Sequence, residues 1–102
     1  MSVVVVATIT PAEGHYDAVK QVLLDTVPQV HTEPGCELYA LQEDGTSLVF
    51  VEKWESADAL RTHSRGEALD RAGRAMRDKL AGPTDVRTFS AVPAGDPVKG
   101  AL

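Results

Sequence analysis

The hydrophobic positions of this chain change their spacing several times, and each change predicts a new element. Residues Val3 to Thr10 are β-branched at almost every position, which disfavours a helix and suits a strand buried on both faces. From Pro11 the apolar residues recur at steps of three and four and predict a helix over about residues 12–31. Pro28 lies inside this stripe, where we expect a kink or an early stop. The stripe consists of Tyr16, Val19, Val22, Leu23, Val27 and Val30.

The next segment, residues 33–54, has the pattern of a β-hairpin. The tripeptide Glu33 to Gly35 ends the helix, because proline cannot continue one and glycine accepts the left-handed dihedrals of a helix end. Cys36 to Gln42 alternates between two faces, and an Asp-Gly turn follows. Leu48 to Trp54 is apolar on both parities at its start, which predicts a central strand covered on both faces.

Two short helices and a last strand complete the pattern. Ser56 is predicted to be a helix N-cap, because serine is favoured at that position. Asp58 follows in the first turn, where backbone N–H groups favour negative charge. A break at residues 65–66 separates this helix from a second one, and Gly82 with Pro83 ends the second. Thr84 to Val92 alternates as a strand. The two helical stripes are Ala57, Leu60 and His63, then Leu69, Ala72, Met76 and Leu80.

The order strand, helix, strand, strand, helix pair, strand predicts an α+β fold of the ferredoxin-like, split βαββαβ type. In this fold an antiparallel sheet carries its helices on one face. We expect residues 1–93 to form one domain and residues 94–102 an arm or disordered tail. Because the first and third strands are apolar on both parities, the other sheet face also needs cover, and a homodimer with sheets packed face to face is the simplest answer.

Composition limits the classes of partner. The 102 residues include 10 basic and 15 acidic ones, giving a formal charge of -5 and a pI near 5.0 without a basic cluster, so nucleic acid is an unlikely partner. The longest apolar run, Val3 to Ala7, is far shorter than the roughly 20 residues of a membrane span, and no basic segment precedes it. We expect a soluble, cytoplasmic protein that does not bind a membrane.

Familiar cofactor and nucleophile motifs are missing from the sequence. It has no Gly-rich phosphate loop, nucleophile elbow or metal-ligand spacing, so we expect neither a metal nor a flavin or other cofactor. The single cysteine, Cys36, is either a small buried apolar residue or a reactive thiol, and its place at a strand start favours the first. His15 and His31 lie at the two ends of the first helix and are expected to be solvated.

Candidate chemistry gathers at the end of the third strand and in the helix after it. Trp54 shares one sheet face with Glu52 and Phe50, and it either lines a pocket or fills the core. His63 lies on the apolar stripe of its helix, so its ring should face inward. It is either a general base for a phenol or a buried histidine bonded to a backbone carbonyl.

Two further side chains, Glu52 and Tyr39, each have two possible roles. Glu52 could orient His63 or a substrate hydroxyl, or it could pair with Arg87 or Lys79. Tyr39 could hydrogen-bond a ligand or pack across from the third strand. The spacing alone does not choose between these roles.

The segments EPGC, LYAL and FVEKWES, followed by Ala-Leu and His63, occur here in the order and spacing of the antibiotic biosynthesis monooxygenase (ABM) family, which this chain resembles. The resemblance covers roughly residues 3–92 and implies a dimeric α/β barrel. The resemblance favours a pocket role for Trp54. We expect Trp54 and His63 to form the catalytic pair. The expected substrate-binding residues are Phe50, Glu52, Tyr39, Thr8 and Met76.

The family includes cofactor-free oxygenases of quinols and polyketide-like phenols, haem-degrading oxygenases and isomerases of small phosphorylated sugars. Haem-degrading relatives carry an Asn near position 8, whereas this chain has Thr8 and no Asn at all. The leading hypothesis is therefore a cofactor-independent monooxygenase of a small phenolic, quinol or polyketide-like aromatic substrate. The alternatives are a non-catalytic dimeric ligand-binding or stress-related module, and an isomerase of a phosphorylated metabolite. The isomerase would need Arg61, Arg65 or Arg87 at the pocket.

Overall fold

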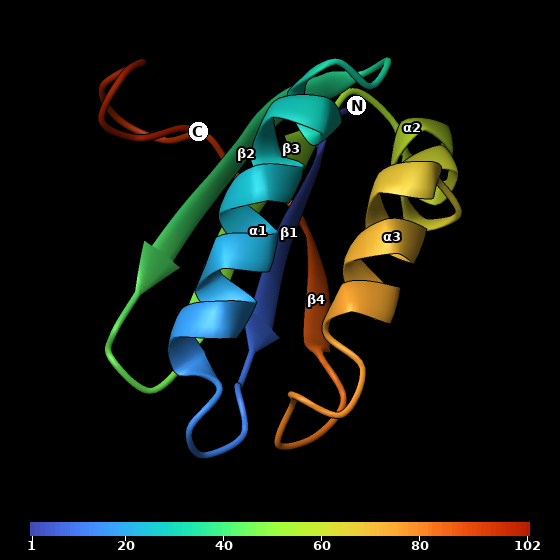
Figure 1. Ribbon diagram of the computed structural model, residues 1–102. Helices are drawn as coiled ribbons and strands as arrows, with labels where there is room; N and C mark the ends of the chain where they lie inside the picture. The colour runs from blue at the N-terminus through green and yellow to red at the C-terminus, as the bar shows by residue number, and fades with distance from the viewer.

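A computed structural model describes all 102 residues and confirms the ferredoxin-like α+β fold (Figure 1). Its elements are β1 (Val3–Ile9), α1 (Tyr16–His31), β2 (Cys36–Glu43), β3 (Leu48–Trp54), α2 (Ala57–Ser64), α3 (Glu67–Ala75) and β4 (Asp85–Ser90). The strands form one antiparallel sheet in the order β2-β3-β1-β4, so β1 and β3 are central, as their apolar sequences predict. All three helices lie on the same side of the sheet (Figure 1). None of them is both long and apolar enough to span a membrane.

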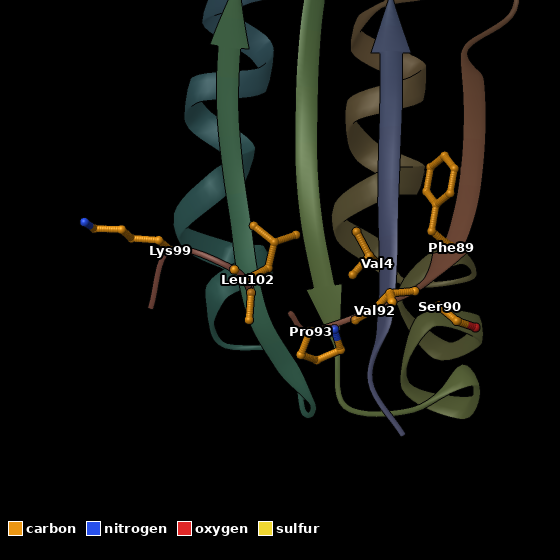
Figure 2. A pocket seen from close by; sticks show the side chains of 10 residues that line it. Val4, Phe89, Ser90, Val92, Pro93, Lys99 and Leu102 are labelled. Carbon is orange, nitrogen blue, oxygen red and sulfur yellow. The ribbon is translucent and has the colours of Figure 1, made fainter. Parts of the chain in front are cut away.

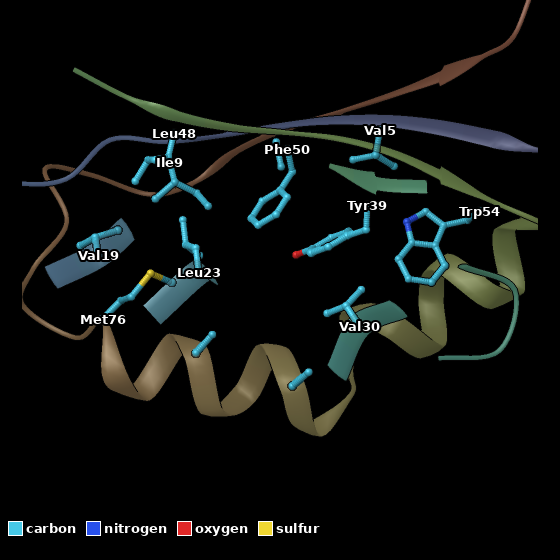
Figure 3. Close-up of a cluster of buried hydrophobic side chains, with 13 residues drawn as sticks. Val5, Ile9, Val19, Leu23, Val30, Tyr39, Leu48, Phe50, Trp54 and Met76 are labelled. Carbon is cyan, nitrogen blue, oxygen red and sulfur yellow. The ribbon is translucent and has the colours of Figure 1, made fainter. Parts of the chain in front are cut away.

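The core lies between the sheet and the helices (Figure 3). Alternate residues of the two central strands face it, and the register places Val5 of β1 opposite Glu52 of β3 and Ala7 opposite Phe50. On β3 the predicted shared face is confirmed, because every second residue from Leu48 to Trp54 is buried. The largest fully buried side chains are Trp54, Phe50, Leu48, Val5, Val19 and Val30.

The first helix begins later than predicted but ends where predicted. It begins at Tyr16 rather than near residue 12, because Pro11 bridges to Leu80 and the Ala12 N–H donates to the Lys79 carbonyl oxygen at 2.8 Å. The predicted end near residue 31 is confirmed, since α1 continues through Pro28 to His31 and does not stop early at the proline. The carbonyl that Pro28 leaves without a helical donor belongs to Leu24, a residue that is 45% exposed.

The third helix ends at Ala75, earlier than the stripe through Leu80 predicts. Three residues further on, Asp78 adopts a positive φ of 67°, and the chain turns so that Leu80 meets Pro11. Leu80 therefore packs against the core from a loop rather than from a fourth turn of helix. This turn also sets the direction in which the chain enters β4.

Glycine at position 35 lets the start of β2 approach α2. Gly35 has φ +81°, and a Cβ built there would lie 2.6 Å from the Cβ of Ala59 in the first turn of α2. Its carbonyl oxygen accepts the Glu55 N–H at 2.8 Å. The residue thus combines a left-handed conformation with a contact that leaves no room for a side chain. It joins the α1-β2 turn to α2.

The opposite sheet face carries no helix and is rich in valine. Strand alternation places Val4 and Val6 of β1 and Val49 and Val51 of β3 on this face. The segment after β4 crosses one end of it, where the Lys53 Nζ donates to the Leu102 carbonyl oxygen at 2.7 Å. Val4, Phe89, Val92, Pro93 and Leu102 border a shallow depression there (Figure 2).

The Gly35 contact makes a prediction about stability. Gly35→Ala should lower the free energy of unfolding by about 2–5 kcal/mol, because the left-handed backbone conformation and the overlap with Ala59 both oppose a side chain. Gly45→Ala is the matched control, since Gly45 has φ +88° with nothing within 4 Å of its Cβ, and it should lose only about 1–2 kcal/mol. Urea unfolding of both variants measures the difference, and equal losses would contradict the contact.

Candidate functional site

A cavity of about 290 Å³ lies between the sheet and the helices. Most of the side chains that line it are apolar, and they come from the three helices, the four strands and the loop before β4. Its ionisable side chains are Tyr39, Glu52 and His63, and no lysine or arginine reaches it. In Figure 3 the Tyr39 hydroxyl points into the space between the sheet and α3. The cavity is thus an apolar chamber with a few polar groups.

Helix α2 directs His63 into the core, as its place on the apolar stripe predicts. The Ser56 hydroxyl caps the helix by accepting the Ala59 N–H at 3.1 Å, which fixes where the helix begins. His63 is only 4% exposed. Its ring stacks on Trp54, with ring centres 4.3 Å apart and planes inclined by 28°, while the Tyr39 ring meets it edge to face at 5.4 Å.

Glu33 is the residue that holds His63. Its Oε1 lies 2.6 Å from His63 Nδ1, a distance typical of a strong, charge-assisted hydrogen bond. A carboxylate can only accept, so Nδ1 carries the hydrogen, and the neutral ring keeps the lone pair on Nε2. The buried histidine is therefore bonded to a carboxylate and not to a backbone carbonyl. Because His63 lines the cavity and Glu33 does not, Nε2 is the nitrogen available there.

Sequence reasoning read Glu33 only as part of a helix stop and missed this role. The two residues are 30 positions apart, and no local pattern links them. They meet because Gly35 packs against Ala59 and brings the α1-β2 turn to α2. The one available signal was the EPGC segment, in which Glu33 stands two positions before the glycine that makes the contact.

Glu52 is a buried carboxyl group on the cavity wall. Its Oε1 accepts the Trp54 Nε1–H at 2.8 Å, and it makes no ion pair with Lys79 or with Arg87, whose guanidinium pairs with Asp85 at 3.1 Å. Burial raises the pKa of Glu52, while the Trp54 hydrogen bond and the nearby His63 act in the opposite direction. Glu52 therefore anchors Trp54 and presents a carboxyl group that resists ionisation.

Tyr39 combines stacking with a hydroxyl in the cavity. Its ring lies 4.2 Å from that of Phe50 with the planes 22° apart. Burial, followed by the charges of Glu52 and Glu33, raises the pKa of Tyr39 above its ordinary value. The hydroxyl thus remains protonated at neutral pH and can donate a hydrogen bond to a ligand.

The structure brings together most of the residues expected at the site. Phe50, Glu52, Tyr39 and Met76 line the same cavity as His63. Trp54 does not line it but lies behind the wall, where it contacts the two lining residues Glu52 and His63.

Thr8 is placed elsewhere, and its expected position on the pocket wall is wrong. Side chains alternate along β1, so Val5, Ala7 and Ile9 face the cavity, whereas Thr8 lies on the opposite sheet face. The arginines needed by an isomerase are also outside. Arg61 and Arg65 are exposed residues that do not line the cavity, and Arg87 pairs with Val6 on the outer face.

The raised pKa of Glu52 predicts how stability varies with pH. A carboxyl whose pKa is higher in the folded state binds its proton more tightly there, so wild-type stability falls as pH rises from the ordinary pKa near 4.5 through the folded value. Glu52→Gln keeps an acceptor for Trp54 without this loss. Its stability relative to wild type should rise with pH over that window, by about 1.4 kcal/mol for each unit of the shift. Urea unfolding from pH 4 to 8 tests this, and a pH-independent difference would contradict it.

One local match to a curated protein is too short to show a relationship. The chain is 45% identical over 49 residues to the ATP-dependent RNA helicase DBP5 of Candida albicans. The match covers 47% of this chain but spans only 9% of the helicase.

Comparison with solved structures gives a consistent result over most of the chain. A candidate antibiotic biosynthesis monooxygenase from Caulobacter crescentus CB15 is 29% identical, with a TM-score of 0.82 over 89% of this chain and 90% of that one. PA3566 from Pseudomonas aeruginosa is 26% identical, with a TM-score of 0.82 over 89% and 94% of the two chains. Rv0793 from Mycobacterium tuberculosis, at 23% identity, shares the fold with a TM-score of 0.85 over 94% and 100%.

The sequence itself assigns the family. Residues 2–75 match the family model described as antibiotic biosynthesis monooxygenase. This segment extends from the start of β1 to the end of α3, and so includes Glu33, Trp54 and His63. The chain belongs to the antibiotic biosynthesis monooxygenase family.

Proposed function

We propose that this protein is a cofactor-independent monooxygenase that oxidises a small phenolic or quinol substrate to a quinone with dioxygen. Family membership supports a monooxygenase-like role. The observation that carries the proposal is His63, which Glu33 holds by Nδ1 while the ring borders an apolar cavity. This arrangement is suited to removing a proton from a weakly acidic hydroxyl.

The Glu33-His63 pair supplies the base. A substrate hydroxyl within hydrogen-bond distance of Nε2 gives its proton to the ring, and the resulting imidazolium is stabilised by the Glu33 carboxylate 2.6 Å from Nδ1. Trp54 stacks on the ring and restricts its orientation. Proton loss turns the phenol into an electron-rich phenolate, which gives electrons to oxygen far more readily than the neutral phenol does.

The oxidation balances with the substrate as the sole electron donor. At a ring carbon that bears hydrogen, ortho or para to the hydroxyl of a phenol and ortho to a hydroxyl of a quinol, a C–O bond to one oxygen atom forms and the C–H bond breaks. The O–O bond also breaks, and the second oxygen atom leaves as water. One phenol and one dioxygen give one quinone and one water, and one quinol and one dioxygen give one hydroxyquinone and one water, with four electrons passing from the ring to oxygen in each case. His63 returns its proton to the departing oxygen, so no net proton is released.

The rest of the cavity supports an aromatic substrate. Phe50 and Tyr39 form a stacked pair on the wall, and the Tyr39 hydroxyl can donate to a substrate oxygen. The apolar lining keeps water from the phenolate and strengthens its hydrogen bonds. A phosphorylated substrate, in contrast, would find no lysine or arginine on the wall and would meet Glu52. The lining therefore favours the oxygenase over the isomerase.

The assigned base predicts a large kinetic effect. With a panel of hydroquinones, naphthols and anthrones, His63→Ala should lower the enzymatic rate of oxygen uptake by roughly 10²–10⁴-fold, the usual contribution of a general base. Glu33→Gln should lower it less, because the hydrogen bond survives while the charge that stabilises the imidazolium is lost. His15→Ala, before α1 and away from the cavity, is the control and should leave the rate unchanged.

Oxygen electrode measurements on folded variants distinguish the candidate functions. Equal rates for wild type and His63→Ala, both above the uncatalysed background, would eliminate the role of His63. Binding of a phenol, seen as thermal stabilisation, without oxygen uptake would instead support the non-catalytic ligand-binding module.

We also propose that a second copy of the chain covers the open sheet face. Val6, Val49 and Val51 form an apolar surface there, and Phe89 on the same face is 47% exposed. An exposed apolar surface is stabilised by burial against another apolar surface. A second copy of the chain, related by a two-fold axis, supplies the same sheet face for this contact.

The proposed dimer predicts a response to charge. Val51→Arg should shift sedimentation from dimer to monomer, because two buried arginines would meet across the two-fold interface. Leu24→Arg, at an exposed position on α1, is the control and should leave the dimer intact. A monomeric wild type at micromolar concentration would contradict the proposal.

A further inference from the structure

Gly73 is an unexpected residue in its position. It is the seventh of the nine residues of α3, where glycine makes a helix about 1 kcal/mol less stable than alanine does. Glycine inside a helix is commonly explained by a left-handed conformation or by a neighbour that leaves no room for a Cβ. Neither applies, because Gly73 has no positive φ and a Cβ built there meets no heavy atom within 4 Å.

The free space beside Gly73 is the entrance to the cavity. Of the residues that line the cavity, only Ser64, Gly73, Thr84 and Val86 are exposed, whereas the others are buried or half-buried. The first two lie on the α2-α3 side and the last two at β4, so the cavity reaches solvent between α3 and β4. Figure 1 shows α3 along the β4 edge of the sheet. A side chain at position 73 would extend into this opening.

The cavity also limits the chemistry of what enters. Its volume of about 290 Å³ is near the lower end of the range for ligand sites, roughly 300–1,000 Å³. It has no cationic group, and the Glu52 carboxyl and Tyr39 hydroxyl are both held toward their neutral forms. A small, uncharged aromatic hydroxyl compound matches these properties.

We propose that Gly73 determines which ring systems the cavity binds, by leaving room in the opening between α3 and β4 for the second ring of a flat, uncharged aromatic compound of two fused rings. Glycine at position 73 makes α3 less stable than alanine would, but it leaves the opening larger by the volume of a side chain. The inference rests on that part of the proposed function which places an aromatic ligand in the cavity. It does not depend on oxidation.

Two stable phenols of different size test the role of Gly73. Phenol and 1-naphthol are titrated into wild type, Gly73→Ala and Gly73→Leu, and binding is followed by NMR at the indole N–H of Trp54, the chain's single Trp. This group contacts Glu52 on the cavity wall. For Gly73→Leu, the affinity for 1-naphthol should fall on the order of tenfold more than that for phenol, the size of effect that an apolar group produces in a binding pocket. Gly73→Ala should show a smaller preference in the same direction and a higher melting temperature.

Ala75→Leu is the matched control, because Ala75 is exposed on the same helix and does not line the cavity. It should bind both phenols as wild type does. The inference would be overturned if Gly73→Leu lost affinity for phenol and 1-naphthol equally, or lost affinity for neither. It would also be overturned if neither compound bound to the wild type. If Gly73→Leu fails to fold, the size preference of Gly73→Ala decides in the same way. If the wild type binds the phenols and the Gly73 variants show the predicted size preference, but no oxygen is consumed, this inference is supported and the monooxygenase proposal is contradicted.

Discussion

The contact between Gly35 and Ala59 is the constraint on which the site depends. It presses the turn after α1 against the first turn of α2, and only a residue without a side chain fits there. Through it, two segments that are distant in sequence place Glu33 beside His63. Trp54, at the end of β3, then fills the space behind the imidazole and bonds to Glu52. The imidazole, its carboxylate partner and its aromatic support are thus positioned by backbone packing rather than by a flexible loop.

Periodicity in the sequence predicts the elements that carry the site. The alternation in β3 places Phe50 and Glu52 on one face, and the stripe of α2 turns His63 inward, because both patterns reflect burial against one core. The expectation for Thr8 comes from the family resemblance, and periodicity cannot check it, because the neighbours of Thr8 are apolar on both faces and hydrophobicity alone gives no parity for β1. An explicit pairing of β1 with β3 is needed to assign it.

Sequence patterns do not predict the contacts that turns make with distant parts of the chain. The start of α1 and the end of α3 both lie next to the bridge between Pro11 and Leu80, which joins two loops that are far apart in the sequence. The Glu33-His63 pair has the same origin. Local propensity describes a segment by its own residues. The helix boundaries and the Glu33-His63 pair, in contrast, depend on partners about 30 to 70 residues away. Contacts between such distant partners commonly override local propensity.

The polar groups of the cavity support the proposal of one class of chemistry for this member of the family. The cavity-facing residues of β1 are Val5, Ala7 and Ile9, so no amide approaches a ligand from that strand. Isomerisation of a phosphorylated compound needs cations that the wall does not have. What the wall offers instead is one imidazole, paired with a carboxylate, beside a hydroxyl and a carboxyl that favour their neutral forms. In the proposed reaction this imidazole takes the proton of a substrate hydroxyl at Nε2 and leaves a single phenolate in an apolar chamber, which is the electron-rich species that the proposed oxidation needs.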